Sequence, residues 1–169
     1  MTGLQLFTLI HVLISLVGIF TGFVVVFGFI AGKQLSLWTP TFLWTTVLTS
    51  VTGYFFPFTG FKPSYVVGAI SLVALAIALY ALYSKHLLGG WRTSYVISSV
   101  VALWLNFFVL IAQSFGKVPA LHALAPNGNE PPFAIAQAGA LIVFIVLGFL
   151  ATRKFRLPVV PIPAGAHSA

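Results

Sequence analysis

In Ser99–Phe133, SVVALWLNFFVLIAQSFGKVPALHALAPNGNEPPF, an apolar segment runs directly into a polar loop. The apolar part contains no charged residue, although it carries the amide side chains of Asn106 and Gln113. The loop is rich in proline and asparagine and holds the only acidic residue of the chain, Glu130. An uncharged apolar helix followed by turn-forming sequence is typical of a membrane-spanning segment and its connection.

The composition of the whole chain supports the same interpretation. Hydrophobic residues make up 60% of the 169 residues and charged residues only 5%, against ~25% charged residues in a soluble domain. The mean hydropathy is +1.10. A chain with so few polar residues cannot cover a water-facing surface, so the lipid bilayer is its expected surrounding.

Charge and cysteine content exclude several classes of protein. Eight basic residues and one acidic residue give a net charge of +7. The basic residues lie in short links and near the C-terminus rather than in one patch, which indicates membrane orientation and not nucleic-acid binding. The chain has no cysteine, which excludes disulfides, thiol chemistry and cysteine-ligated metal centres.

Five apolar runs are long enough to cross a bilayer, which takes ~17–25 residues. The sequence therefore predicts an all-α integral membrane bundle of five transmembrane helices, forming one domain over 1–156, with a flexible proline- and alanine-rich tail over 157–169. The second run is rich in threonine, and a four-span arrangement with this run outside the bilayer stays open. The predicted spans are 4–31, 39–56, 64–83, 93–115 and 133–151.

Five spans place the two termini on opposite sides of the membrane. Lys62 and Lys117 then share a side with the N-terminus, whereas six basic residues share a side with the C-terminus. Because cytoplasmic links carry an excess of lysine and arginine, we expect the N-terminus outside and the C-terminus in the cytoplasm. The six residues are Lys33, Lys85, Arg92, Arg153, Lys154 and Arg156.

Strong polar side chains gather in the outer halves of the predicted helices, judged from a rise of ~1.5 Å per residue. We interpret them as a candidate outer polar pocket, for which hydrogen bonds between helices are the simpler alternative. The pocket residues are His11, Ser15, Thr52, Asn106, Gln113 and Gln137. The candidate roof of this pocket consists of Lys62, Lys117, His122 and Glu130, with Glu130 expected to pair with one of the two lysines.

Small residues mark possible contact faces on the first helix. His11, Ser15, Gly18 and Gly22 fall on one helical face. The pairs Gly18–Gly22 and Gly28–Gly32 have the spacing of small residues at membrane helix contacts. This spacing predicts a packing seam, either within the chain or toward a second copy or another membrane protein.

Sequence motifs give little support for catalysis. The chain contains no H-E-x-x-H, no G-x-S-x-G and no phosphate-binding loop. We therefore predict no cofactor and lean against an enzyme. A haem held by His11 and His122, or a bound quinone, stays open as an alternative.

Several short motifs resemble those of a family of small bacterial inner-membrane proteins of unknown function. They are Asn106-Phe107-Phe108-Val109-Leu110, Lys117-Val118-Pro119-Ala120-Leu121, Ala125-Pro126, Glu130-Pro131-Pro132-Phe133, Gly53-Tyr54-Phe55-Phe56-Pro57-Phe58 and Gly89-Gly90-Trp91-Arg92. The resemblance covers roughly residues 50–150. It implies a multi-pass helical bundle in the bacterial inner membrane and brings no activity with it.

Three functional hypotheses follow. The first is a non-enzymatic accessory or assembly subunit, which featureless apolar helices and small-residue seams favour. The second is a binder of a quinone, lipid or haem in the outer polar pocket. The third is a small transporter or channel, which the polar second helix favours and the lack of intramembrane charge disfavours.

Overall fold

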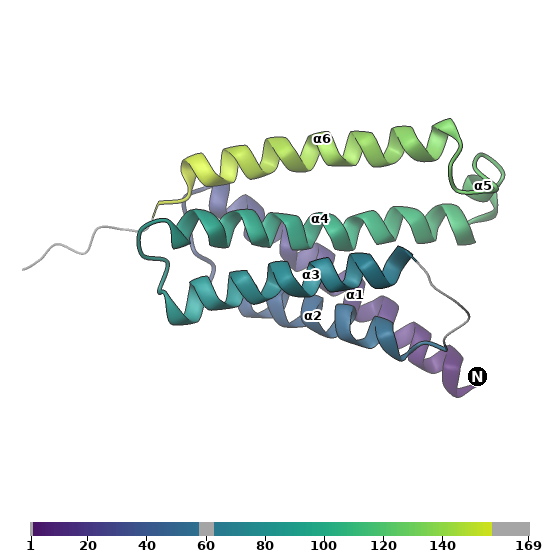
Figure 1. Cartoon of the computed structure of the whole chain (residues 1–169), viewed down its shortest axis with the longest axis horizontal. Coiled ribbons are helices and arrows are strands. Elements are labelled where there is room, and N and C mark those ends of the chain that lie inside the picture. Colours follow the sequence, from purple (N-terminus) through teal and green to yellow (C-terminus); the bar gives the residue numbers. More distant parts are fainter. Residues whose placement is uncertain (1, 58–62, 157–169) are drawn as a thin grey trace, which may run out of the picture.

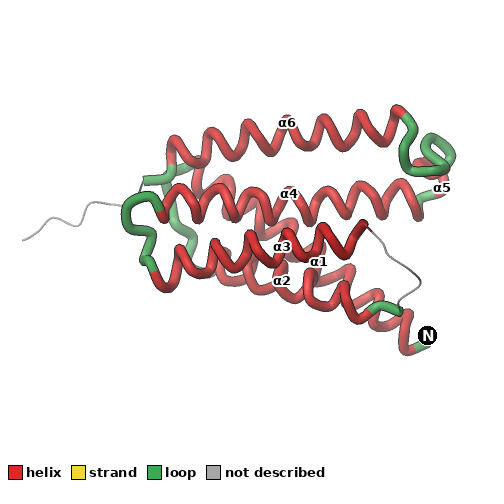
Figure 2. The backbone as a smooth tube through the Cα atoms, in the orientation of Figure 1, coloured by secondary structure: helices red, strands yellow, loops and turns green. Residues whose placement is uncertain are grey.

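The computed structural model describes residues 2–57 and 63–156, and within these ranges every regular element is helical (Figure 2). Lys62 and the predicted tail over 157–169 lie outside the described residues. The elements are α1 (Gly3–Ile30), α2 (Trp38–Thr52), the 3-10 turn η1 (Gly53–Phe55), α3 (Pro63–Leu79), the π-helical turn η2 (Tyr80–Ser84), α4 (Trp91–Lys117), α5 (Pro119–His122) and α6 (Pro131–Lys154).

Local sequence signals explain several of the helix ends. The Thr2 hydroxyl accepts a hydrogen bond from the Gln5 amide, while the Gln5 side chain accepts one from the Thr2 amide, a reciprocal cap that starts α1. Gly32, with φ of +70°, follows the end of α1, where glycine is favoured because it has no Cβ. Two prolines begin α6, since proline has no amide hydrogen to lose in a first turn.

Four helices are long and apolar enough to cross a membrane: Gly3–Ile30, Pro63–Ser84, Trp91–Lys117 and Pro131–Lys154. They correspond to four of the predicted spans and lie within three residues of the predicted ends. The second predicted span is shorter than expected, because α2 has 15 residues and the chain then tightens into η1. The all-helical architecture and these four apolar helices fit a membrane protein.

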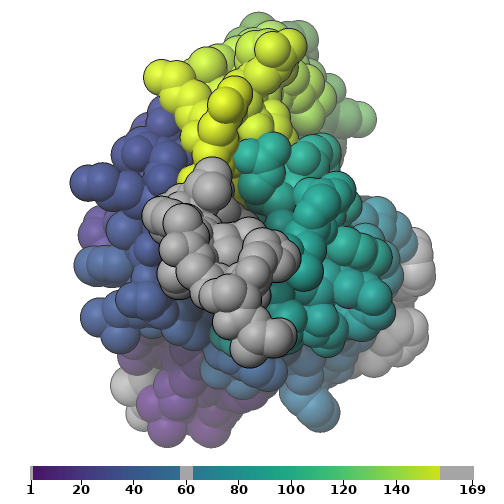
Figure 3. Space-filling model, turned by 90° about the vertical axis from the view of Figure 1, so that its left-hand side faces the viewer, coloured from purple at the N-terminus to yellow at the C-terminus, as the bar shows by residue number. Residues whose placement is uncertain are grey.

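Successive long helices alternate in direction along the bundle, with α4 lying between α3 and α6 (Figure 1). The start of α1 and the α5 loop lie toward one end, which we call the α5 end. Figure 3 looks onto the opposite end, where the 31–37 link, the start of α4 and the end of α6 come together. We call it the basic end, because six lysine and arginine side chains lie there. They are Lys33, Lys85, Arg92, Arg153, Lys154 and Arg156.

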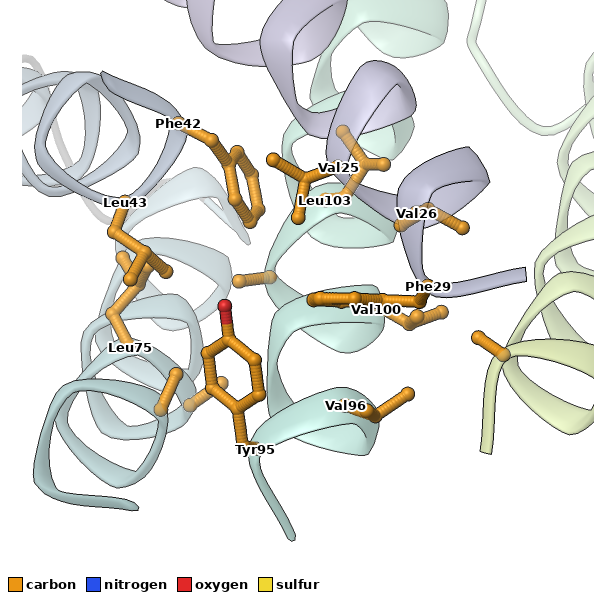
Figure 4. Close-up of a cluster of buried hydrophobic side chains, with 14 of the residues drawn as sticks. Val25, Val26, Phe29, Phe42, Leu43, Leu75, Tyr95, Val96, Val100 and Leu103 are labelled. Carbon is orange, nitrogen blue, oxygen red and sulfur yellow. The ribbon is translucent and has the colours of Figure 1, made fainter. Parts of the chain in front are cut away.

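The core lies in the half of the bundle nearer the basic end. Phe29 of α1 packs against Tyr95 of α4 and against Phe155, with ring centroids 5.3 and 4.8 Å apart. Because lipid tails are as apolar as the core, close packing between side chains holds these helices together. Figure 4 shows the main members: Val25, Val26, Phe29, Phe42, Leu43, Leu75, Tyr95, Val96, Val100 and Leu103.

Helix α6 is the least enclosed of the long helices. It packs against α4 and α1, and only Phe144 and Ala151 are buried along its length. Large apolar side chains elsewhere on α6 are exposed, with Ile135 70% and Ile142 62% accessible. In a bilayer this surface faces lipid or another protein.

Candidate functional site

Two hydrogen bonds connect polar residues of α1 to its neighbours. The Ser15 hydroxyl donates to Asn106 Oδ1 on α4 at 2.9 Å. One turn nearer the α5 end, His11 Nδ1 lies 2.8 Å from the Thr52 hydroxyl at the end of α2. Four of the six predicted pocket residues therefore meet in pairs along one face of α1.

The amide nitrogen of Asn106 faces the backbone of Gly18. It lies 3.4 Å from the position that a Cβ on Gly18 would occupy, and the hydroxyls of Thr45 and Thr46 lie 3.2 Å from the same point. Asn106 is 7% exposed, and its Nδ2 has no hydrogen-bond partner within the described part of the chain. The absence of a side chain at Gly18 leaves room beside α1 for the Asn106 amide and for these two threonines of α2.

The seam on α1 continues to Gly22. A Cβ at this position would lie 2.5 Å from Leu103 Cδ1 of α4 and 2.8 Å from Phe42 Cε2 of α2. Together with the bonds of His11 and Ser15 and the close approach at Gly18, this contact places His11, Ser15, Gly18 and Gly22 on one packing face, as predicted. Gly18 and Gly22 thus form contacts between helices of the same chain, and they allow α1 to approach both α2 and α4.

The two glutamines lie apart from this seam. Gln137 Nε2 donates to the Phe108 carbonyl at 3.1 Å, which joins α6 to α4. Gln113 is exposed, although it follows Asn106 by seven residues on α4. On α1 the buried positions begin only at Gly18, so little of α1 covers the outer turns of α4. The structure consequently brings four of the six predicted pocket residues together in pairs and places Gln113 and Gln137 elsewhere.

Glu130 is held by its own loop. Its Oε1 accepts from the backbone and side-chain amides of Asn127, at 3.0 and 2.8 Å, and its Oε2 accepts from the Asn129 amide at 3.1 Å. These bonds, the backbone bond from Asn127 first, lower the pKa of Glu130 to about 2. Glu130 and Lys117, both in the described part of the chain, form no ion pair, and Lys62 lies outside the described residues.

A hollow of about 280 Å³ lies beneath the loop, between the end of α4 and the start of α6. His122 and Asn127 contribute polar side chains to its lining, and Phe115 and Phe133 contribute apolar ones. Their rings lie 5.5 Å apart in an edge-to-face arrangement. This hollow includes one predicted roof residue, His122, and none of the predicted pocket residues.

Polar groups are also buried in the half of the bundle nearer the basic end. From the sequence we expected the strong polar side chains in the outer half instead. Tyr95 of α4 and Thr39 of α2 are 0% and 2% exposed, and Figure 4 shows the Tyr95 hydroxyl pointing into the core. Ser99, one turn further along α4, is also fully buried. The signal was present in the sequence, because Tyr95, Ser99 and Asn106 share a helical face.

The two histidines considered for haem lie in different surroundings. His11 contacts Thr52 and packs edge-on against Phe56, whereas His122 faces the hollow beneath the loop. Across residues 2–57 and 63–156, no group of three or more His, Asp or Glu side chains is placed to hold a metal ion.

The fold and these contacts define an all-helical bundle with several membrane-compatible helices, which hydrogen bonds between polar groups connect to one another. No family model, curated protein or solved structure matches the chain. The function proposed below is consequently based on the geometry of this chain alone.

Proposed function

We propose that this chain is a five-span protein of the bacterial inner membrane that serves as a non-enzymatic accessory or assembly subunit. The observation that carries the proposal is the use of its intramembrane polar groups. Ser15 with Asn106, His11 with Thr52 and Gln137 with the Phe108 carbonyl all join one helix to another. Side chains engaged in this way stabilise a bundle whose apolar exterior is free for other contacts.

The length of the α2 segment supports a fifth span. With η1 it forms a continuous helical stretch over 38–55. At ~1.5 Å per residue for the α-helix and ~2.0 Å for the 3-10 turn, this stretch measures about 28 Å. The hydrocarbon core of a bilayer is ~30 Å thick.

Five of the six threonines of α2 are suited to a lipid environment, whereas the buried hydroxyl of Thr39 has no hydrogen-bond partner within the described residues. The hydroxyls of Thr41, Thr45, Thr46, Thr49 and Thr52 each donate to a backbone carbonyl four residues earlier, at 2.6–2.9 Å. A satisfied hydroxyl costs far less in hydrocarbon than a free one. The threonine content of α2 is therefore compatible with membrane insertion.

The distribution of charge supports the orientation that we propose, with the N-terminus outside and the C-terminus in the cytoplasm. Six basic residues lie at the basic end, whereas Lys117 is the single lysine or arginine described at the α5 end. The positive-inside rule favours the basic end as cytoplasmic.

Native mass spectrometry of protein extracted gently from its own membrane tests the accessory role. We expect a reproducible larger assembly containing a second kind of protein. A His11→Ala/Asn106→Leu variant that still folds should keep this assembly, because these side chains act within the bundle. A free monomer under every mild extraction condition would contradict the proposal.

A second candidate function is binding of a small amphipathic molecule such as a quinone near the outer face. The hollow beneath the loop favours it, because His122 and Asn127 adjoin apolar walls there. Its volume of about 280 Å³ is just below the ~300–1,000 Å³ of ordinary ligand pockets. The hollow would hold a ring or headgroup while a tail extends into lipid.

The same mass spectra test this candidate. An added small-molecule mass lost in Phe115→Ala and His122→Ala, but kept in the exposed-site control Gln113→Ala, would support it. The value of the mass separates a quinone or lipid from haem, for which a Soret band is a second readout. An added mass that all three variants retain would place the ligand elsewhere.

A further inference from the structure

A long apolar groove runs between α4 and α6 on the outside of the bundle. It has a volume of about 180 Å³, and its open edge is formed by Ile97, Val101 and Trp104 of α4 and Leu141, Ile145 and Phe149 of α6. The two helices lie side by side here (Figure 1). Ile97, Ile145 and Phe149 are 50%, 61% and 56% exposed, so the groove opens toward the surrounding lipid.

Gly148 creates space in this groove. It lies opposite Val100, whose Cγ1 is 3.4 Å from the position of a Cβ on Gly148. A larger residue would extend into the space between the two helices. The missing side chain therefore leaves this part of the groove unfilled.

The groove is short enough to lie within one leaflet. Trp104 is the central residue of α4, and the seven-residue interval from Ile97 to Trp104 corresponds to about 10 Å of helix rise. One leaflet contributes ~15 Å of the ~30 Å hydrocarbon core. The groove thus extends from near the basic end to the middle of the bilayer, as an acyl chain does.

Positively charged side chains lie next to the end of the groove that is nearer the basic end of the bundle. The Arg153 guanidinium lies 5.0 Å from the ring centroid of Phe149, which lines the groove. Lys154 follows it, and Arg92 donates a hydrogen bond to the Phe155 carbonyl. Lys33 belongs to the same end, because the Lys154 carbonyl lies 3.5 Å from the position of a Cβ on Gly32.

No acidic side chain balances this charge. The single acidic residue of the sequence, Glu130, is in the loop at the α5 end. Basic side chains next to an apolar cleft between membrane helices are a recurring setting for anionic lipid headgroups. The charge at the rim thus complements a phosphate, and the groove complements a hydrocarbon chain.

We propose that the α4–α6 groove and the basic residues at its rim form a binding site for one anionic phospholipid. An acyl chain lies along the groove as far as Trp104, and the phosphate lies against Arg153, with Lys154 and Arg92 beside it. The lipid belongs to the leaflet at the basic end. The site is separate from the hollow beneath the loop and does not depend on the accessory role proposed above.

The test compares two lipids with identical acyl chains, dioleoyl phosphatidylglycerol and dioleoyl phosphatidylcholine, titrated into the detergent-solubilised protein and followed by native mass spectrometry. The phosphatidylglycerol adduct should form at roughly tenfold lower lipid concentration, since each basic residue near the surface favours an anionic lipid. Equal occupancy by the two lipids would overturn the proposal.

Charge variants test the rim. Arg153→Gln/Lys154→Gln should reduce phosphatidylglycerol binding roughly tenfold and leave phosphatidylcholine unchanged. Lys117→Gln at the α5 end is the control and should keep the preference. Full preference in the double variant would show that the charge at the rim does not select the lipid.

Groove variants test the apolar part. Ile145→Trp fills the groove from its lipid-facing side, and Gly148→Leu fills it from within, so each should reduce the adducts of both lipids. Gly139→Leu is the matched control, because nothing lies within 4 Å of a Cβ on Gly139. Thermal unfolding is the check that Ile145→Trp is folded, and an unchanged phosphatidylglycerol adduct in that folded variant would overturn the proposal.

Discussion

Ser15 and Asn106 are 91 positions apart in the sequence, yet the Ser15 hydroxyl donates a hydrogen bond of 2.9 Å to the Asn106 side chain. The bond joins α1 to the central helix of the bundle at a position where Asn106 is 7% exposed. An amide in hydrocarbon is costly without a partner. This pair therefore fixes the rotation of α1 about its axis relative to α4.

A double-mutant cycle with Ser15→Ala and Asn106→Leu measures this pair. We expect a coupling free energy of about 0.6 kcal/mol, and at most ~1.7 kcal/mol, because the unfolded chain in a membrane also finds partners for its polar groups. Reversible unfolding in mixed micelles gives the four stabilities. Thr8→Ala, whose exposed hydroxyl bonds only to the Leu4 carbonyl of its own helix, is the control. A coupling of zero would contradict the role given to the bond.

The packing of Gly22 gives a second prediction. Gly22→Ala should destabilise the bundle by ~1–3 kcal/mol, because its Cβ would lie 2.5 Å from Leu103 Cδ1 and 2.8 Å from Phe42. Gly139→Ala on α6 has open space around the new methyl group and should be neutral, or more stable by ~0.5–1 kcal/mol from the better helix former. The same unfolding assay compares them. Equal effects at the two glycines would show that the α1 seam is loosely packed.

Glu130 provides a prediction on pH. Its pKa is lowered from 4.5 to about 2, so the ionised carboxylate stabilises the loop fully above pH ~4.5, and this contribution is lost as the pH falls through about 2. Because Glu130 is the single acidic residue in the chain, its carboxyl carbon can be titrated by NMR without interference from other acidic side chains.

Variants of the two loop asparagines test the cause of this shift. Asn127→Ala removes the side-chain donor and should raise the pKa of Glu130 toward its usual value. Asn129→Ala keeps the backbone amide that bonds to Glu130 and should leave the pKa unchanged. If Asn129→Ala raised the pKa as much as Asn127→Ala, the loop geometry described above would be wrong.

Single-cysteine labelling tests the fifth span. The chain has no cysteine, so Gln34→Cys and Ser64→Cys each place one thiol at an exposed position. If α2 crosses the membrane, a membrane-impermeant maleimide added to intact cells labels Ser64→Cys and leaves Gln34→Cys unlabelled until the cells are opened. If both react from the same side, α2 does not cross the bilayer and the chain has four spans.

Neutralising Arg153, Lys154 and Arg156 together tests the proposed orientation. We expect a fraction of molecules to lose the cytoplasmic orientation of a C-terminal reporter, because three of the six basic residues at that end are then missing. Neutralising Lys117 is the control and should leave the orientation unchanged. A reporter that stays fully cytoplasmic in the triple variant would show that earlier links set the topology.

The helical, membrane-compatible character of this protein can be predicted from its amino-acid sequence, because an apolar run of bilayer length satisfies its backbone hydrogen bonds within one helix. The sequence also determined the face of α1 that carries Ser15 and Gly22, since side chains four and seven residues apart on a helix point the same way. Which partners these faces meet depends on how the helices pack in three dimensions. Asn106 is buried because α1 packs over it, whereas Gln113 is exposed because the packing of α1 does not extend to that turn. The groove between α4 and α6 likewise depends on which two helices lie side by side, a relation between distant segments that helical periodicity does not contain.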